Sequence, residues 1–296
     1  MHMKEIASAI DISVLVPSRG RPDKLISMIK SALATAANSD RIEFCVWIDD
    51  DDSSYDSLLN SSLDLPIKVL RGPRALLNMM YNSLLIIAKG NYFLWVGDDT
   101  QFRTNSWDRL LIKGINKFQD KVGVVYVNDL GEYNQIWANV GMVHRNWIDS
   151  FGYLFSPHMR DNGGDGWITD VARQVNRCAF FDDVIIEHMQ HRQGKAETDA
   201  TYEDRNSSNQ WNDLHGLYRL LIDERRREAL YLSIIWPNIR IEFKYRYLIA
   251  TIYVELRRKW KPLSKKREVY FLSMSNKKFL LRALNAFFLK NHYQWR

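Results

Sequence analysis

The chain has 296 residues, enough for one large domain or one domain with an appendage, and 46% of them are hydrophobic. No apolar run reaches the ~18 residues of a membrane-spanning helix, and the N-terminal sequence lacks the pattern of a secretion signal. The two cysteines both lie in apolar runs, which predicts buried, reduced thiols in a cytoplasmic protein rather than a disulfide framework.

The net charge of +6 is unevenly distributed along the chain. Residues 240–296 contain 15 Lys+Arg and 3 Asp+Glu, a net charge of +12, whereas residues 1–239 contain 26 and 32, a net charge of −6. A concentrated basic segment favours binding to a polyanion, either nucleic acid or an anionic membrane surface. We expect a main domain over residues 1–225 and a basic, aromatic-rich helical extension over residues 226–296.

Apolar strands alternate with helical patterns through the main domain. Strands are predicted at residues 11–20, 41–52, 65–72, 92–99 and 122–129, and helices at 21–37, 74–90 and 104–118. The second of these helices is expected to end at Gly90. Strands that are apolar throughout and separated by helices predict a mostly parallel sheet covered by helices on both faces.

The carboxyl ends of these strands carry polar and charged residues. They are Ser18-Arg19, the four acids at 49–52, the basic segment at 71–74 and the pair Asp98-Asp99. Ligands of open parallel sheets bind at this edge. The sequence has no Gly-rich phosphate-binding loop of either common nucleotide-binding type.

The motif "NYFLWVGDDTQF" at residues 91–102 places two adjacent carboxylates at the end of a buried strand. Their mutual repulsion and their desolvation both cost free energy, so a compensating group is required. A divalent cation such as Mg²⁺ or Mn²⁺ is one solution, with substrate phosphates as further ligands and arginines nearby. The alternative is a solvated acidic turn that precedes the helix at 104–118.

The order of the motifs resembles the nucleotide-sugar-binding half of GT-A fold glycosyltransferases of the family 2 type. The matching segments are "ISVLVPSRGRPDKL", "WIDDDDSSYD" and "NSLLIIAKGNYFLWVGDD", in which Asn82, Ala88 and Gly90 fit the helix pattern. The segment "GKAETDATY" resembles a subgroup from phages and bacteria. The resemblance covers roughly residues 12–203.

This resemblance implies a GT-A fold, which is an α/β, Rossmann-like fold with a mostly parallel sheet, and it implies roles for individual residues. Asp99 and His188 would hold the metal ion, with His191 as the rival to His188. Asp165, at the front of the helix in "GGDGWITDVARQVNR", would be the catalytic base, with Asp161 and Asp170 as alternatives. The residues implied for donor binding are Ser18, Arg19, Asp49, Asp50, Arg71, Arg74, Asn78, Asn82, Asp98 and Lys195.

The function implied by the resemblance is an inverting transfer of a sugar from a nucleotide-sugar, expected to be a UDP-sugar, to an acceptor hydroxyl, with Mn²⁺ or Mg²⁺. The phage-like segment and the basic C-terminal region favour a hydroxylated base in double-stranded DNA as acceptor, and a host cytoplasm as location. One alternative is a surface glycan or lipid-linked acceptor at an anionic membrane face. A second is a non-catalytic nucleic-acid-binding protein on the same fold.

Overall fold

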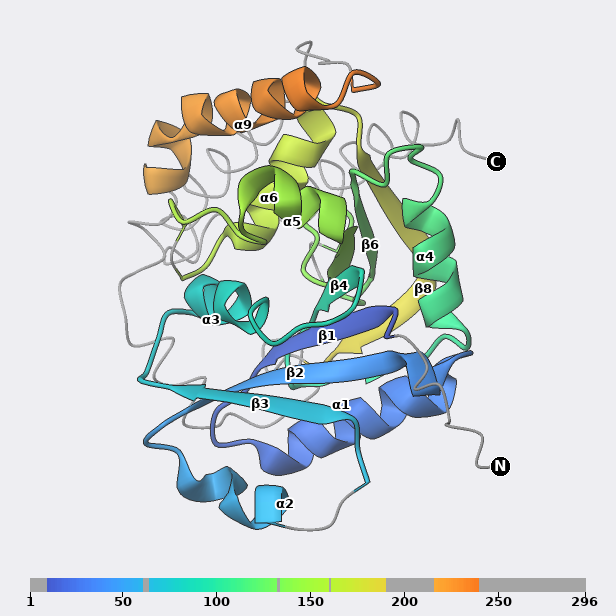
Figure 1. The fold of residues 1–296 in the computed structure, drawn as a ribbon, viewed down its shortest axis with the longest axis vertical. Coiled ribbons are helices and arrows are strands. Elements are labelled where there is room, and N and C mark those ends of the chain that lie inside the picture. The colour runs from blue at the N-terminus through green and yellow to red at the C-terminus, as the bar shows by residue number, and fades with distance from the viewer. Residues whose placement is uncertain (1–9, 61–63, 132–133, 160, 190–215, 240–296) are drawn as a thin grey trace, which may run out of the picture.

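The computed structural model describes residues 10–60, 64–131, 134–159, 161–189 and 216–239, and within them an eight-stranded sheet has helices on both faces (Figure 1). The strands are β1 (Ile12–Pro17), β2 (Ile42–Asp49), β3 (Ile67–Gly72), β4 (Tyr92–Trp95), β5 (Thr100–Phe102), β6 (Val124–Asn128), β7 (Gly141–His144) and β8 (Cys178–His188). The helices are α1 (Pro22–Thr35), α2 (Asp56–Asn60), α3 (Leu77–Leu84), α4 (Trp107–Ile115), α5 (Arg145–Phe151), α6 (Gly164–Gln174) and α9 (Ile222–Ile235), and short 3-10 turns lie at Ser39–Arg41 and Ser53–Tyr55.

The strand order is β3-β2-β1-β4-β7-β6-β8-β5. The first four strands in this order are parallel, β7 is antiparallel to both β4 and β6, and β8 is parallel to β6 and antiparallel to β5. Two reversals in succession restore the original direction, so β6 and β8 run the same way as β4. The end of β8 therefore lies at the same edge of the sheet as the carboxyl ends of β1, β2 and β4.

The expected strands and helices are present, with three differences. Helix α3 ends at Leu84, six residues before Gly90, because the segment that follows turns to enter β4. The three-residue strand β5 has too short a pattern to be predicted from sequence. Strand β7 makes the sheet mixed, since its antiparallel direction is set by pairing with β4 and β6 rather than by its own composition.

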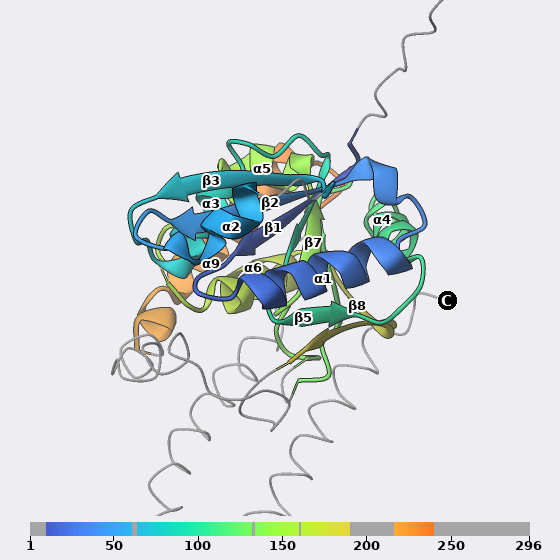
Figure 2. The ribbon, with the colours of Figure 1, turned by 90° about the horizontal axis from the view of Figure 1, so that it is seen from below.

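Two hydrophobic cores lie on opposite faces of the sheet, each between the strands and helices seen in Figure 2. Helices α1 and α4 pack on one face; in α1 the buried residues are Leu25, Met28, Ile29 and Ala32, which lie on one side of a helix. Helices α3, α5, α6 and α9 cover the other face, where Trp147 and Trp167 are fully buried. The described helices include none that combines the length and apolarity needed to cross a bilayer.

Helix α9 packs against α6 and spans the expected boundary at residue 225. The remainder of the expected extension, residues 240–296, lies outside the described residues. The division into two domains therefore stays a prediction.

A buried carboxylate holds the amino ends of three strands together. Glu43 in β2 accepts hydrogen bonds from Ser13 Oγ (2.6 Å) and from the backbone N–H of Lys89 (2.5 Å), and it forms an ion pair with Lys68. Gly90 N–H donates to Ser13 Oγ (2.8 Å), and a Cβ at Gly90 would lie 2.7 Å from the backbone nitrogen of Ser13. The Ala-x-Gly pattern at residues 88–90 thus serves strand packing at the edge of the sheet opposite the carboxyl ends.

We predict that Glu43→Gln lowers the free energy of unfolding at pH 7 by about 1–3 kcal/mol, as expected when charge-assisted hydrogen bonds are lost. Burial opposes ionisation of Glu43, but the hydrogen bonds and the Lys68 charge outweigh it and hold the pKa of this carboxyl below its ordinary value. A depressed pKa stabilises the fold at neutral pH, and this contribution disappears as the pH falls through the folded-state pKa. Urea unfolding from pH 3 to pH 7 should therefore show a smaller pH dependence for the variant.

The matched control for this experiment is Asp64→Asn, which removes one carboxylate from an exposed position before β3. Its stability should stay within about 0.5 kcal/mol of the wild type. Equal stability of Glu43→Gln and the wild type at pH 7 would contradict the role given to Glu43.

Candidate functional site

Asp98 and Asp99 follow the end of β4 after two intervening residues and are both buried, with 5% and 7% of their surface exposed. Ser18 Oγ, in the loop after β1, donates a hydrogen bond to Asp98 Oδ2 (2.7 Å). Arg21 Nη1, in the same loop, lies 3.3 Å from Asp98 Oδ1 and 3.7 Å from Asp99 Oδ2. One guanidinium therefore faces both carboxylates.

The environment of Asp98 opposes its ionisation. Burial, and next the negative charge of Asp99, raise the pKa of Asp98 to about 6, against the opposing effects of Arg21 and the Ser18 hydroxyl. A carboxylate pair with this property is stabilised by a bound proton or by an additional cation. Strongly shifted carboxylates gather at functional sites, which favours a functional interpretation of the pair over a solvated acidic turn.

His188, the last residue of β8, supplies the other partner of this pair. Its Nε2 lies 3.1 Å from Asp99 Oδ1, and its side chain is 25% exposed. The pairing of Thr100 in β5 with His188 and a hydrogen bond from Met189 N–H to the Asp99 carbonyl (2.8 Å) fix the two segments side by side. The rival candidate, His191, lies outside the described residues.

The spacing of Asp99 and His188 fits a shared metal ion. Neighbouring ligand atoms of an octahedral ion with ligand distances of about 2.1 Å lie about 3.0 Å apart, close to the 3.1 Å between Asp99 Oδ1 and His188 Nε2. In the part of the chain that the structure describes, no group of three or more His, Cys, Asp or Glu side chains surrounds one metal position. Two protein ligands still suit an Mg²⁺-like ion, which commonly takes its other ligands from water and substrate phosphates.

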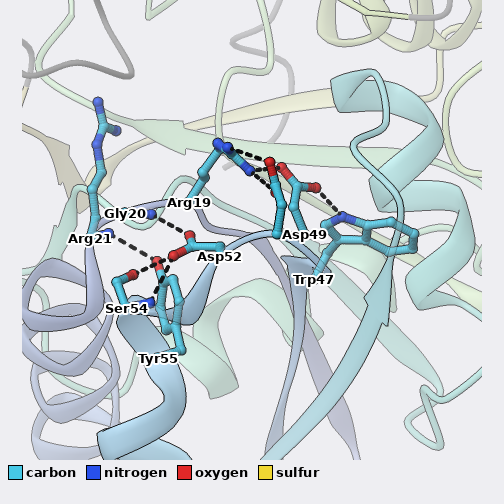
Figure 3. A network of polar contacts seen from close by, with 9 residues as sticks. Arg19, Gly20, Arg21, Trp47, Asp49, Asp52, Ser54 and Tyr55 are labelled. Atoms are coloured by element: carbon cyan, nitrogen blue, oxygen red, sulfur yellow. Dashed lines mark hydrogen bonds and ion pairs between the residues drawn. The ribbon is translucent and has the colours of Figure 1, made fainter.

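The loop between β1 and α1 has a fixed backbone (Figure 3). Gly20 has φ +63°, in the left-handed region that glycine adopts at little cost, and its N–H donates to Asp52 Oδ2 (2.7 Å). The N–H of Arg21 donates to the Tyr55 hydroxyl (3.1 Å), which lies 2.5 Å from Ser18 Oγ. The turn after β2 therefore positions the two residues that contact Asp98.

A second acidic cluster lies at the end of β2. Asp49 is 1% exposed and accepts hydrogen bonds from Trp47 Nε1 (2.8 Å) and Arg19 Nη1 (2.8 Å). Arg19 also forms two hydrogen bonds with the carboxylate of Asp51, at 2.5 and 2.9 Å. Asp50 is exposed, so of the two expected acids Asp49 is the one built into the network at this edge (Figure 3).

The three other basic residues expected to contact phosphates differ in their placement. Arg71 forms an ion pair with Asp56 (2.7 Å) at the surface, which directs its guanidinium toward α2. Arg74 is exposed in the loop before α3. Lys195 lies outside the described residues.

The two asparagines of α3 contact the segment that leads into α6, and their expected role in donor binding stays a prediction. Asn82 accepts hydrogen bonds from the N–H groups of Leu154 and Phe155 (both 3.0 Å) and donates to the Phe155 carbonyl (2.8 Å). Asn78 is buried and donates to the Met159 carbonyl. Their amides are therefore engaged by the segment that leads into α6.

Helix α9 holds the same segment from the other side. Glu228 accepts hydrogen bonds from Tyr153 Oη (2.7 Å), Ser156 Oγ (3.0 Å) and Trp167 Nε1 (2.7 Å). Burial raises the pKa of Glu228 despite these hydrogen bonds. Residues 153–167 thus lie between polar anchors on α3 and on α9.

The three candidates for a catalytic base have different surroundings. Asp161 accepts a hydrogen bond from Leu77 N–H (3.2 Å), at the first residue of α3. Asp170 contacts the Tyr218 hydroxyl (2.5 Å) and pairs with Arg225 Nε (3.2 Å) of α9. Both have structural partners that explain their positions.

Asp165 lies in the first turn of α6 and is half-buried. Its Oδ1 accepts a hydrogen bond from the adjacent Gly166 N–H (2.8 Å). The N-cap of α6 is Gly163, so Asp165 lies inside the helix and does not cap it. Asp165 is thus the one of the three acids that lies at the front of α6.

Sequence reasoning missed Arg21 and Tyr55. Arg21 precedes Pro22 at the start of α1, so the sequence signal there is that of a helix start. Tyr55 lies in a four-acid, polar turn that has no periodic pattern. Arg21 and Tyr55 are separated in sequence from the residues they contact by 77 and 37 positions, so no local pattern reveals them. The sequence signal for Arg21 is only that the negative charges of Asp98 and Asp99 require a basic partner.

Comparison with known proteins finds likeness at the level of fold. No family model matches the chain, and no curated protein matches it. The mannosyltransferase PcManGT from Pyrobaculum calidifontis, solved with GDP-Man and Mn²⁺, is 13% identical with a TM-score of 0.53, over 96% of this chain and 88% of that one. Residues 1–349 of S. aureus TarS, solved with UDP-GlcNAc, are 14% identical with a TM-score of 0.51, over 79% and 68%.

A further similar structure is GalNAc-T7 with UDP, GalNAc and Mn²⁺, at 11% identity and a TM-score of 0.50, over 61% of this chain and 44% of that one. The match to the longer TarS chain spans 36% of its length. Identities this low carry the fold and no more, so the family 2 type and the phage subgroup stay predictions. The mixed sheet with helices on both faces is the GT-A fold of these nucleotide-sugar glycosyltransferases.

Proposed function

We propose that the chain is a metal-dependent glycosyltransferase that moves a sugar from a nucleotide-sugar to an acceptor hydroxyl. The observation that carries this proposal is the buried Asp98-Asp99 pair beside His188, at the ligand-binding edge of a GT-A sheet. A divalent ion bound there would neutralise charge that develops on the departing nucleoside diphosphate. The similar structures were solved with UDP-GlcNAc, GDP-Man or UDP, and two of them with Mn²⁺, which supports a donor of this class.

Each residue has a proposed part in donor binding. Asp99 and His188 would hold the metal ion, and Asp98 would contact the ribose. Asp49 reads the nucleobase, because it is buried and oriented by Trp47 and Arg19. Ser18 and Tyr55 orient Asp98 through their hydroxyl groups. Arg74 and Lys195 are the proposed contacts for the diphosphate. Arg71 is less suited to contact the diphosphate because it forms an ion pair with Asp56.

We assign the proton transfer to Asp165. Its carboxylate accepts the proton of the acceptor hydroxyl as that oxygen attacks the anomeric carbon, and the nucleoside diphosphate leaves from the opposite face. This single displacement inverts the anomeric configuration. The support is the position of Asp165 at the front of α6, together with the structural roles of Asp161 and Asp170.

The proposed acceptor is a hydroxylated base in double-stranded DNA, acted on in the cytoplasm. Its support is the net charge of +12 in residues 240–296. The competing acceptor, a glycan or lipid-linked sugar at an anionic membrane, is favoured by apolar side chains at the end of α9: Tyr231, Ile234 and Ile235 are 47%, 68% and 37% exposed. A non-catalytic nucleic-acid-binding protein would need neither the buried acidic pair nor His188.

The first experiment on this proposal measures nucleoside diphosphate release from a panel of UDP- and GDP-sugars, with Mn²⁺ or Mg²⁺ and with and without hydroxymethylated DNA. The wild type should release nucleoside diphosphate only with a metal ion. Asp99→Asn should lower turnover by more than about 100-fold, because it removes a metal ligand. It should also abolish the rise in melting temperature that Mn²⁺ gives the wild type.

The control is Asp23→Asn, an exposed acid in the first turn of α1, which should keep both turnover and the Mn²⁺ response. If Asp99→Asn keeps both as well, the metal site lies elsewhere. If the wild type releases no diphosphate from any donor in the panel and binds none of them, the glycosyltransferase proposal fails.

A second prediction separates the base from the donor site. Asp165→Asn should lower transfer by about 10²–10⁴-fold, the usual contribution of general base catalysis. The dissociation constant of the donor should change by less than about threefold, because the base contacts the acceptor. Isothermal titration with the donor, beside single-turnover transfer, measures the two effects.

Asp161→Asn and Asp170→Asn serve as comparisons within the same region. Each breaks a structural contact, so each should lower the melting temperature while leaving single-turnover transfer within about tenfold of the wild type. A nearly normal rate for Asp165→Asn, with either of the other two inactive, would move the base to that residue.

A third prediction concerns the acceptor. Charge reversal of Arg257, Arg258, Lys259 and Lys261 together should weaken DNA binding and lower its dependence on salt while donor hydrolysis continues. Replacing Phe287, Phe288 and Leu289 with serine should leave DNA binding unchanged if DNA is the partner. Filter binding to DNA and co-sedimentation with anionic liposomes, in one buffer, distinguish the partners. Strong liposome binding without DNA binding at low salt would favour the membrane acceptor instead.

A further inference from the structure

We propose that Arg21 is a built-in counter-cation of the Asp98-Asp99 pair, and that it must leave the pair before a divalent metal ion binds there. The diphosphate of the donor gives the displaced guanidinium a new anionic partner, so that metal and donor bind cooperatively. This inference rests on the proposed function, because it concerns the same site. It adds a control on metal entry that is built into the apo protein.

The carboxylate oxygens of the pair each face a polar group. Ser18 Oγ donates to Asp98 Oδ2 at 2.7 Å, and Arg21 Nη1 lies 3.3 Å from Asp98 Oδ1. The same Nη1 lies 3.7 Å from Asp99 Oδ2, and His188 Nε2 lies 3.1 Å from Asp99 Oδ1. A metal ion therefore enters a site in which every oxygen already has a neighbour.

These neighbours differ in their compatibility with a metal ion. The serine hydroxyl carries no charge, and a neutral imidazole is itself a metal ligand. The guanidinium of Arg21 is a permanent cation that cannot lose its proton at any pH the protein tolerates. Because it lies against both carboxylates, it repels an incoming divalent cation, and it can relieve that repulsion only by moving.

The backbone at Arg21 is held by contacts that do not involve its side chain, which is 9% exposed. The N–H of Arg21 is held by the Tyr55 hydroxyl (3.1 Å), and the preceding Gly20 N–H by Asp52 (2.7 Å). Arg21 extends from this anchored loop in a different direction from Arg19, which is engaged by Asp49 and Asp51 (Figure 3). Rotation about its side-chain bonds is the movement by which the guanidinium would leave the pair.

A diphosphate is a suitable second partner for this guanidinium. Arginine binds phosphate through two parallel hydrogen bonds, which are stronger than those between neutral groups. When a donor draws Arg21 away, the affinity of the pair for metal rises, and by linkage bound metal raises the affinity for the donor by the same factor. The apo protein therefore resists loading with metal alone.

The test measures Mn²⁺ binding to the full chain without nucleotide, by electron paramagnetic resonance of free Mn²⁺ at pH 8. Arg21→Gln removes the counter-cation and should tighten Mn²⁺ binding by at least about tenfold. Arg19→Gln removes the same charge two residues away, where the partners are Asp49 and Asp51, and should leave the Mn²⁺ dissociation constant within about twofold. Arg21→Lys keeps the charge and should resemble the wild type.

Two further measurements place the effect at this pair. In the double variant Arg21→Gln/Asp99→Asn the tighter Mn²⁺ binding should be lost. In Arg21→Gln the pair lacks its internal cation, so Mn²⁺ should raise the melting temperature more than it does in the wild type. If Arg21→Gln does not fold alone, refolding in Mn²⁺ should recover it, and failure of Mn²⁺ to do so overturns the proposal.

Mn²⁺ affinity in Arg21→Gln equal to or weaker than that of the wild type also overturns it, as does an equal gain in Arg19→Gln. These outcomes are distinct from failure of the proposed function. Tighter Mn²⁺ binding in Arg21→Gln with no turnover of any nucleotide-sugar would retain the counter-cation and reject the glycosyltransferase. Turnover of a donor, together with an unchanged Mn²⁺ affinity in Arg21→Gln, would support the glycosyltransferase and reject the counter-cation.

Discussion

The site is organised by the free energy required to keep Asp98 and Asp99 ionised, side by side, at the end of a buried strand. Their compensating groups come from separate parts of the chain: the loop after β1 supplies Ser18 and Arg21, and β8 supplies His188. Each partner is in turn held by the fold, since Tyr55 orients Ser18 and pairing with β5 positions His188. The negative charge of the two carboxylates is thus compensated where four segments meet: the turn after β4, the loop after β1, the turn after β2 and the end of β8.

Glu43 and Asp98 are two buried carboxylates whose charges are compensated to different degrees. Glu43 has an ion pair and hydrogen bonds that outweigh its burial, and its pKa is lowered. Asp98 has a serine and a shared arginine, and its pKa rises to about 6. Both residues are almost fully buried. The first carboxylate is satisfied by the fold alone, whereas the second retains a deficit of positive charge that a ligand can fill.

The sequence predicted what depends on position along a strand or helix. Asp98, Asp99 and Asp49 follow apolar strands, so their place at the carboxyl edge could be inferred, and so could the strands themselves. The direction of β7 and the contacts of Arg21 depend on pairing between distant segments, which periodicity does not encode. Asn82 matches a helix pattern of the resembling family by spacing, and the amides of Asn78 and Asn82 contact backbone groups more than 70 residues away in sequence. Their role could be known only from the folded chain.

The anchors on residues 153–167 have a consequence for how proteins of this architecture diverge. Asn82 of α3 and Glu228 of α9 both form hydrogen bonds with this segment. Leu77, the first residue of α3, also donates a hydrogen bond from its N–H to Asp161. The half of the sheet that carries the acidic pair and the half that follows β7 are therefore interlocked by side chains rather than joined as separable modules. Exchange of this segment between proteins would therefore break these hydrogen bonds unless α3 and α9 changed with it.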